Sequence, residues 1–303
     1  MSEVLAIVGP TASGKSGLAL AVARLRTAAG RPTELVAVDA FTIYRGMDIA
    51  TASPSAAERA EVPHHLVDVL EPWEELTVAA FQRLARDAIA DVRERGATPL
   101  LVGGSGLYWR AVVDDLRFPP TDPAVRAALE VRWRDRPLDA HAHLASLDPA
   151  AAERIDPANL RRTVRALEVI ELTGGRFSHH HDDGWRRFDS VVGTLSVAYL
   201  EPEAERLRER ITTRAATMVA GGLLDEARAL RGLPKALSRT AAQAIGYAEA
   251  FAVLDGELPG DQLATAIARR TWRYARRQRA WFRADPRCEP IDPVAAHRRL
   301  AGG

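Results

Sequence analysis

Short runs of apolar residues alternate with segments of helical spacing in the first third of the chain. A continuous apolar run bounded by turn residues is typical of a strand buried on both faces of a parallel sheet, whereas helical spacing places apolar residues on one face. The predicted strands are residues 4–8, 35–38 and 99–102. The predicted helices are residues 17–30 and 77–95. This order predicts an α/β fold with a doubly wound parallel sheet flanked by helices.

The pattern changes after Phe118, where two prolines follow. From there to about Ser196 the spacing is helical, Asp-Pro pairs interrupt it, and no strand is convincing. A strand-like stretch at 190–200 follows, and the remainder is helical again. We therefore expect a core of residues 1–118 and 197–303, interrupted by a helical insertion at 119–196.

Composition limits the kinds of protein that fit. The 303 residues include 41 basic and 40 acidic ones, a net charge of +1, so any nucleic acid must be bound by a local patch. The lone Cys288 can form no internal disulfide and no cysteine-based zinc site. No apolar run approaches the roughly 20 residues of a membrane span, and the first residues lack the basic flank of a signal peptide. We expect a soluble cytoplasmic protein with no membrane partner.

A phosphate-binding pattern follows the first predicted strand. Residues 9–16, GPTASGKS, fit G-x-x-x-x-G-K-[ST] between a strand and a helix, where backbone N–H groups wrap phosphate oxygens. Lys15 would reach the phosphates, and the Ser16 hydroxyl would help to hold Mg²⁺. A chance glycine-rich turn is the alternative, but only Lys15 and Lys235 are lysines in this chain. The residues expected to bind a diphosphate or nucleotide such as ATP are Gly9, Pro10, Thr11, Ala12, Ser13, Gly14, Lys15 and Ser16.

The acid expected of a nucleotide hydrolase is missing from its usual place. The strand at 99–102 is followed by Gly103, Gly104 and Ser105, with no carboxylate to orient water. An acid instead follows the second strand, at Asp39, above the carboxyl edge of the sheet where ligands bind. A general base toward an acceptor is a sensible role. A helix cap, or a Mg²⁺ ligand through water, is the alternative.

The motifs together resemble the bacterial tRNA dimethylallyltransferases, the IPP transferase family. The segments that carry the resemblance are GPTASGKS (9–16), DAFTIYRGMDIATASP (39–54), VPHHLVDVLEP (62–72), VGGSGLY (102–108), NLRRTVRALEVIELTGG (159–175), GLLDEARAL (222–230), RxxxQAIGYxE (239–249) and ARRQRAWFR (275–283). The resemblance implies a P-loop NTPase-like core. It also implies transfer of a dimethylallyl group from dimethylallyl diphosphate to N6 of the adenosine 3′ of the anticodon in tRNA, with Mg²⁺ and release of diphosphate.

The resemblance also implies roles for single residues. Asp39 would be the general base on the adenine amino group, Ser105 would lie near the reacting centre, and Arg239 would close on the diphosphate. Ala40 and Thr42 stand where the family usually has Ser and Gln, so this chain departs from the family on the acceptor side. The residues expected to contact the anticodon stem-loop of tRNA are Asp39, Ala40, Phe41, Thr42, Ser105, Arg126, Arg161, Arg162, Thr163, Val164, Arg165, Arg273, Arg276 and Arg277.

A cationic helix is predicted near the end of the chain. Residues 269–283 contain seven arginines and no acid. At about 100° per residue, six of them fall in an arc of roughly 140°, which suits contacts with phosphates. These six are Arg269, Arg270, Arg273, Arg276, Arg277 and Arg283. A solvated surface helix is the alternative interpretation.

Other functions share some of these features. A small-molecule P-loop kinase would use the same loop, but a lid signature is missing and the arginine helix is unexplained. A prenyltransferase for free adenylate would share Asp39, but not the insertion. A non-catalytic RNA-binding protein is suggested only by Ala40 and Thr42. A metal site at His64-His65 or at 179–181 is a minor alternative. Trp272 and Trp281 could pack in the interior or stack on bases. We expect a monomer.

Overall fold

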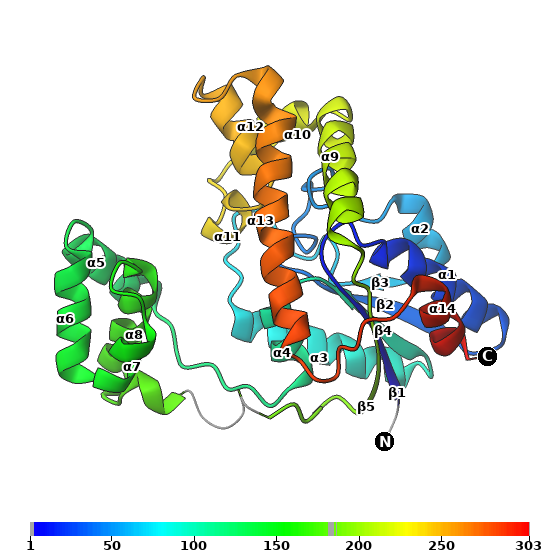
Figure 1. Ribbon diagram of the computed structural model, residues 1–303, viewed down its shortest axis with the longest axis horizontal. Coiled ribbons are helices and arrows are strands. Elements are labelled where there is room, and N and C mark those ends of the chain that lie inside the picture. The colour runs from blue at the N-terminus through cyan, green and yellow to red at the C-terminus, as the bar shows by residue number, and fades with distance from the viewer. Residues whose placement is uncertain (1–2, 181–184, 186, 303) are drawn as a thin grey trace. The chain divides into compact units, whose positions relative to one another are not determined.

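The computed structural model describes residues 3–180, 185 and 187–302 (Figure 1). The chain forms two compact units, 1–114 with 189–303 and 115–188, called here the core unit and the helical unit. The sequence predicts the insertion at 119–196, but the structure assigns 189–196 to the core unit. The reason is that the last strand of the core already begins at Thr194.

The core unit contains a parallel five-stranded sheet with the order β3-β2-β4-β1-β5. The central register pairs Leu5 with Leu100, and Leu100 with Leu35. The strands are β1 (Glu3–Val8), β2 (Thr33–Val38), β3 (His64–His65), β4 (Thr98–Gly103) and β5 (Thr194–Tyr199). The three strands predicted in the first third are confirmed. The edge strand β3 is two residues long, too short to give a hydrophobic run.

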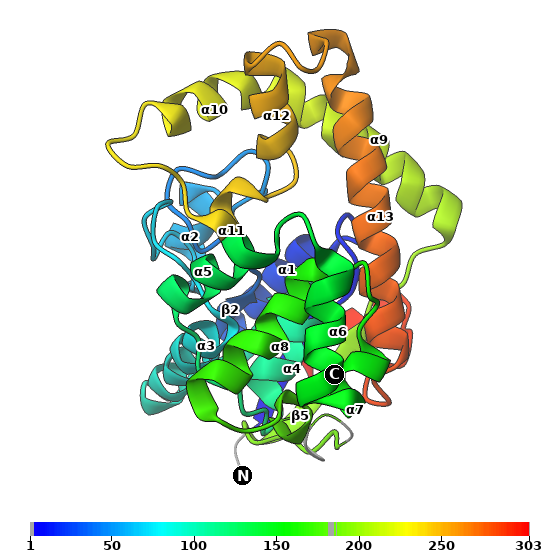
Figure 2. The ribbon, with the colours of Figure 1, turned by 90° about the vertical axis from the view of Figure 1, so that its left-hand side faces the viewer.

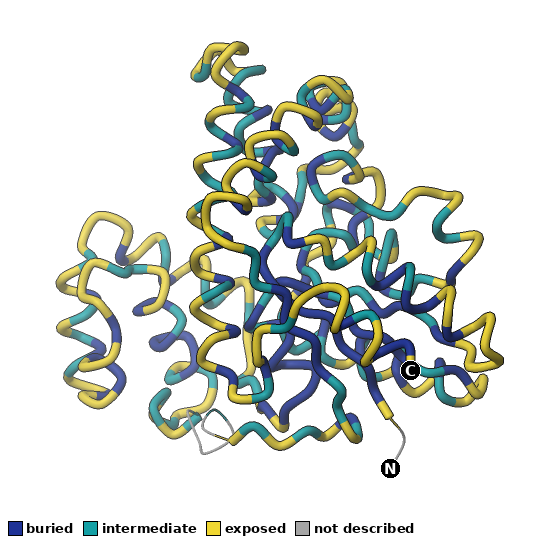
Figure 3. Tube along the Cα trace, turned by 45° about the vertical axis from the view of Figure 1, so that its right-hand side comes forward, coloured by how far each residue is buried: buried dark blue, intermediate teal, exposed yellow. Residues whose placement is uncertain are grey.

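Helices cover both faces of the sheet, which explains the continuous apolar strands. Alternate strand residues such as Leu5 and Ile7 pack with α1 (Lys15–Ala28) and α14 (Pro293–Ala301). The opposite residues, such as Ala6, join a larger cluster. That cluster includes side chains of α3 (Val78–Glu94) and α4 (Gly106–Val113). Figure 3 shows the strands as the most continuous buried part of the core unit.

A second group of helices in the core unit extends beyond the sheet (Figure 2). Its two longest members, α9 (Ala204–Ala220) and α13 (Leu263–Arg283), pack against each other through Leu207, Ile211 and Ala275. The remaining helices of the core unit are α2 (Ala56–Glu61), α10 (Leu223–Arg231), α11 (Arg239–Ala242), α12 (Tyr247–Leu254) and the short η3 (Gly260–Gln262). Among the described residues, no helix is long and apolar enough to cross a lipid bilayer.

The helical unit has its own core, built around Trp133, Leu144 and Leu167. Two of the Asp-Pro pairs that punctuate the sequence are helix starts, because the Asp122 and Asp148 side chains accept hydrogen bonds from first-turn N–H groups and proline fits the first helical position. The elements are α5 (Pro123–Trp133), α6 (Pro137–Leu147), α7 (Pro149–Arg154), α8 (Leu160–Thr173) and η1 (Phe177–His180).

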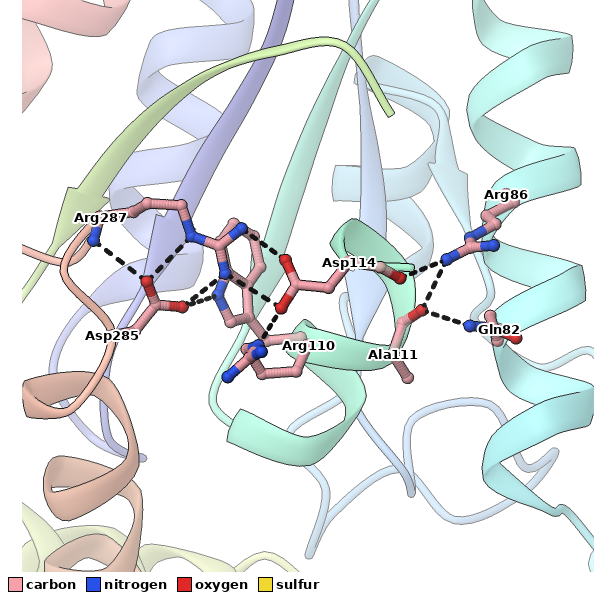
Figure 4. Close-up of polar contacts among 8 residues, drawn as sticks. Gln82, Arg86, Arg110, Ala111, Asp114, Asp285 and Arg287 are labelled. Atoms are coloured by element: carbon pink, nitrogen blue, oxygen red, sulfur yellow. Dashed lines mark hydrogen bonds and ion pairs between the residues drawn. The ribbon is translucent and has the colours of Figure 1, made fainter. Parts of the chain in front are cut away.

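The chain leaves the core unit and returns to it at adjacent residues. Asp114 forms an antiparallel bridge with Ser190, and the Val191 N–H donates to the Val113 carbonyl at 2.8 Å. The buried Asp114 carboxylate accepts from Arg287 Nη1 at 2.6 Å. Figure 4 shows the contact of Asp114, at the end of α4, with Arg287 in the segment after α13. Both ends of the insertion are therefore fixed to one buried point of the core unit.

A second buried carboxylate completes this network. Arg287 Nη2 donates to Asp285 Oδ2 at 2.7 Å, and Trp109 Nε1 donates to the same oxygen at 3.0 Å. Burial raises the pKa of Asp285, but these hydrogen bonds outweigh it and lower the pKa overall. The carboxylate stays charged, which keeps the end of α13 attached to α4.

Candidate active site

A cavity of about 650 Å³ lies over the carboxyl ends of the strands in the core unit. Residues that follow three different strands line it: the loop after β1, Asp39 after β2, and Gly103 and Gly104 at the end of β4. Ligands of open parallel sheets bind at this edge. The residues that the sequence singled out after separate strands are therefore brought to one place by the topology.

The loop after β1 has the conformation of an anion cradle. Gly14, the residue before α1, is left-handed with φ 97°, and no side chain caps the helix start, so the first N–H groups of α1 have no side-chain acceptor. Thr11, Ala12, Ser13, Gly14, Lys15 and Ser16 all line the cavity. Gly9 does not line it and instead packs on the Leu200 backbone, where a Cβ would lie 2.4 Å from the carbonyl oxygen. Pro10 supplies a carbonyl that accepts from Lys15 Nζ at 2.7 Å.

The charge of Lys15 depends on its surroundings. Burial lowers its pKa to about 8, the neighbouring Asp39 carboxylate opposes this, and Arg214 adds to it. The Ser13 hydroxyl is buried in the same loop and has no hydrogen-bond partner among the described residues. A bound anion would stabilise the charged Lys15 and could accept from Ser13. Both features fit a phosphate ligand.

Asp39 stands opposite this loop. Its Oδ1 accepts from the Phe41 N–H at 2.9 Å within a turn, and the carboxylate lines the cavity. The helix cap considered from the sequence is not present, because the described residue range 39–55 contains no helix and the next one, α2, begins at Ala56. Phe41 and Thr42 line it as well, whereas Ala40 is buried away from it. The Thr42 hydroxyl is buried without a partner among the described residues. An acceptor with polar edges would satisfy it.

Two arginines that the sequence did not indicate complete the cation set. Arg210 and Arg214 project from α9 and line the cavity. Arg210 Nη1 donates to the Ser13 carbonyl at 3.3 Å, and Arg214 Nη2 to the Thr51 carbonyl at 3.4 Å. Burial lowers the pKa of Arg214, and Asp39 opposes this. The signal available in the sequence was their spacing of four, which puts both on one face of a helix.

Helix α13 closes the cavity with Tyr274 and Gln278. Burial and the Asp39 charge raise the pKa of Tyr274, and a hydrogen bond with Ser105 lowers it in part. Ser105 begins α4 and does not line the cavity itself, so it reaches the site through Tyr274. The Gln278 Oε1 accepts from the Thr11 N–H at 2.9 Å.

Arg239 does not lie in this cavity. It is exposed at the start of α11, and its N–H donates to Glu75 Oε1 at 2.6 Å. The expectation that Arg239 closes on a diphosphate is not met in this conformation. Arg210 and Arg214 occupy the place beside the loop.

The arginines of α13 divide into two groups. Arg273, Arg276 and Arg277 are exposed, as predicted for a binding face. Although residues 269–283 contain no acid, acids from other segments pair with the second group. Arg270 pairs with Glu249 at 2.9 Å. Glu201 pairs with two further arginines at 2.7 Å each, namely Arg279 and Arg283.

In the helical unit, most of the residues predicted to contact tRNA have side chains that are buried or paired with a buried acid. Arg126 and Arg165 both pair with the buried Glu168, at 2.6 and 2.8 Å. Thr163 and Val164 are buried in the unit's interior, because they lie on the inner face of α8. The structure does not support a surface contact by these two side chains. Arg161 and Arg162 are exposed and stay candidates.

The histidines have structural partners. His64 Nδ1 lies 2.7 Å from the Val62 carbonyl oxygen, and His65 Nε2 lies 2.6 Å from Glu34 Oε2. In the part of the chain that the structure describes, no group of three or more His, Cys, Asp or Glu could hold a metal ion. Of the histidine run at 179–181, His181 lies outside the described residues. The guanidinium carbon Cζ of Arg208 lies 4.7 Å from the centroid of the Trp272 ring. Trp281 is 41% exposed.

Comparisons with known proteins agree on one family. A sequence model described as IPP transferase matches residues 42–285. A tRNA dimethylallyltransferase of Kineococcus radiotolerans is 49% identical, with coverages of 98% of this chain and 95% of the relative. One from Thermobifida fusca is 48% identical, with coverages of 95% and 89%. The crystal structure of the full-length tRNA isopentenylpyrophosphate transferase from Bacillus halodurans, 36% identical, covers 100% of this chain and 96% of that chain with a TM-score of 0.67.

Proposed function

Because the chain belongs to the IPP transferase family, we propose that this prenyltransferase moves a dimethylallyl group from dimethylallyl diphosphate to tRNA. The acceptor atom is N6 of the adenosine 3′ of the anticodon, and the products are N6-dimethylallyladenosine and diphosphate. One observation carries the proposal: a cation-rich phosphate loop and the Asp39 carboxylate line a single cavity.

The donor end of the cavity suits a diphosphate leaving group. Lys15, Arg210 and Arg214 supply fixed positive charge, and the loop supplies backbone N–H groups. As the bond between C1 of the prenyl group and the diphosphate oxygen breaks, negative charge develops on the diphosphate. Cations held there stabilise the transition state more than the ground state, which lowers the barrier.

Mg²⁺ fits at the same end. Ser16 is exposed and lines the cavity, and its hydroxyl oxygen is a ligand that Mg²⁺ accepts. Mg²⁺ usually retains several waters and shares substrate phosphates, so it needs no cage of protein carboxylates. Ser16 would hold the ion together with the donor oxygens. When bound, Mg²⁺ neutralises charge on the diphosphate.

The acceptor end requires a base and a way to hold adenine. N6 forms a bond to C1 while the C1–O bond breaks, and the N6 proton passes to the Asp39 carboxylate. The Phe41 N–H holds that carboxylate in place. The Phe41 ring offers a surface for a base turned out of its stack, and the unpartnered Thr42 hydroxyl offers a hydrogen bond.

The tRNA backbone would lie on exposed arginines. Arg273, Arg276 and Arg277 on α13, and Arg161 and Arg162 on α8, carry the charge that phosphates require. Because tRNA is the proposed acceptor, we propose that the reaction takes place in the cytoplasm.

The test is a direct assay of the product. The protein is incubated with Mg²⁺, dimethylallyl diphosphate and either unmodified tRNA or AMP, and a gain of one C5H8 unit is sought by mass spectrometry. We expect the gain on tRNA alone. A gain on AMP would indicate an adenylate prenyltransferase, phosphate transfer from ATP to a small molecule would indicate a kinase, and no gain on tRNA at saturating protein contradicts the proposal.

The role of Asp39 has its own prediction. Asp39→Asn keeps the shape of the side chain and removes the base, so kcat should fall by about 10²- to 10⁴-fold while donor binding changes little. Single-turnover kinetics and titration with the donor measure the two effects. The matched control is Asp48→Asn, an exposed acid of the same loop. Equal rates for the two variants would remove Asp39 from the base role.

A further inference from the structure

Gln278 links the arginine helix to the phosphate loop. It is 3% exposed on α13, and its Oε1 accepts from the backbone N–H of Thr11 at 2.9 Å across 267 residues of sequence. Thr11 is the residue at which the loop enters the cavity, which Gln278 also lines. The buried Gln278 amide therefore connects α13 to the phosphate loop by a direct hydrogen bond.

Gly104, which directly follows β4, packs closely against the Gln278 amide. A Cβ at Gly104 would lie 2.5 Å from Gln278 Nε2 and 3.0 Å from the Gly9 carbonyl oxygen. Only glycine leaves room for the Gln278 side chain and for the phosphate loop at once. Gln278 is thus held between the loop and β4, and its Oε1 position is determined by packing on both sides.

The same helix contacts the acceptor side of the site. Tyr274, one turn before Gln278, lines the cavity and is hydrogen-bonded to Ser105. On its outer face the helix exposes Arg273, Arg276 and Arg277. One rigid helix therefore carries the candidate tRNA-binding charges, the contact with Ser105 and the contact with the phosphate loop.

We propose that Gln278 is a positioning residue for the prenyl donor, holding the Thr11 end of the phosphate loop in its anion-binding shape from α13. The inference rests on the proposed function, which makes the loop a diphosphate site. Gln278 accepts the Thr11 N–H, so that N–H is fixed and the following N–H groups face the ligand. Without this acceptor a buried donor loses its partner, and ordering of the loop must be driven by donor binding.

This role predicts an effect on donor binding that is separate from chemistry. Gln278→Met keeps the length of the side chain and removes the strong acceptor, so the KM for dimethylallyl diphosphate should rise about tenfold. The kcat and the KM for tRNA should stay within about twofold, because no group near the reacting atoms has changed. Steady-state rates are measured with each substrate varied at saturation of the other. The matched control is Gln262→Met, an exposed glutamine at the other end of α13.

Titration with inorganic pyrophosphate and Mg²⁺ separates this inference from the proposed function. Gln278→Met should bind pyrophosphate about tenfold more weakly than the unaltered protein, whether or not tRNA is prenylated. If the unaltered protein binds pyrophosphate but never modifies tRNA, the proposed function fails and Gln278 keeps its role. If Gln278→Met does not fold, Gln278→Asn, which keeps a buried amide but is one methylene too short, should show the same increase.

Two results would overturn the role of Gln278. The first is an unchanged donor KM and pyrophosphate affinity in a folded variant. The second is an equal rise in the KM values for donor and tRNA together with a lowered melting temperature, because that pattern indicates general loosening of α13. A donor-specific rise that is absent in Gln262→Met supports the role.

Discussion

The helical unit and α13 are both rich in arginine, and the sequence predicts that arginines of both contact tRNA. In the helical unit, Arg126 and Arg165 turn inward to Glu168. On α13, Arg273 and Arg276 face solvent, with no ion pair to any described acid. Arginine density is the same signal in both places. What differs is whether the fold places a buried carboxylate within reach.

Glu168 explains the inward turn. Its side chain is fully buried on α8, and a buried carboxylate requires partners for its charge and its lone pairs. It receives hydrogen bonds from Thr121 Oγ1 at 2.7 Å and from the Asp122 N–H at 2.9 Å, besides those from the two arginines. Arg126 and Arg165 therefore stabilise the connection from α5 to α8, and α13 keeps its free charges for a partner.

The largest predicted effect is a loss of stability when the ion pairs of the helical unit are broken. Replacing Arg126 and Arg165 by Gln leaves Glu168 buried without a cation, which should cost about 3–5 kcal/mol of the free energy of unfolding of this unit. Urea denaturation measures the change, followed by tryptophan fluorescence in a background that keeps only Trp133, which lies in the same core, among the six tryptophans of the chain.

The control for this experiment lies on the same helix. Arg161 and Arg162 are exposed, so replacing both by Gln should change the free energy of unfolding by no more than about 0.5 kcal/mol. If the two double variants were equally stable, the difference between buried-pair and surface arginines in this unit would be refuted.

The next effect concerns α13 and is one of affinity. Replacing Arg273, Arg276 and Arg277 by Gln should weaken tRNA binding by about tenfold or more. The slope of log K against log salt should become shallower by about 3, one for each lost phosphate contact. Filter binding across a salt series measures both. Arg270→Gln, which removes an arginine paired with Glu249, should leave the slope unchanged; a shallower slope there would contradict the division of the helix.

The smallest effect is a pH dependence of the helical unit. Burial raises the pKa of Glu168, but hydrogen bonds from Thr121, Arg126 and Arg165 outweigh it, so the folded pKa lies below the ordinary value. The stabilisation is complete above the unfolded pKa of about 4.3 and is lost as the pH falls through the folded pKa. Urea denaturation at pH 3 to 6 should show this loss, and Glu168→Gln should flatten it. An unchanged slope in that variant would exclude Glu168 as its source.

Local patterns predicted the part of the fold that depends on neighbours in sequence. Apolar runs located β1, β2 and β4, and the glycine and lysine spacing located the phosphate loop, because both signals lie within about ten residues. The strand β3 was missed because a two-residue edge strand has no hydrophobic period. Two of the Asp-Pro pairs were interpreted as interruptions, although their side chains start helices.

The rest of the site depends on contacts between distant segments. Arg210 reaches Ser13 across 197 residues, and Gln278 reaches Thr11 across 267, so no local pattern indicates either contact. Thr163 and Val164 share a motif with exposed arginines but lie on the other face of α8. Motif membership gave their position in the chain, and the packing of the helix decided which side chains are available.

The bridge between Asp114 and Ser190 makes the helical unit an insertion between two neighbouring points of the core unit. Asp114 before it and Ser190 after it are bridged to each other within the core unit, and Arg287 holds Asp114 in place. A segment inserted between adjacent residues can lengthen, shorten or diverge without shifting the register of the flanking strands. Selection can therefore reshape the 115–188 segment while the phosphate loop and Asp39 keep their geometry.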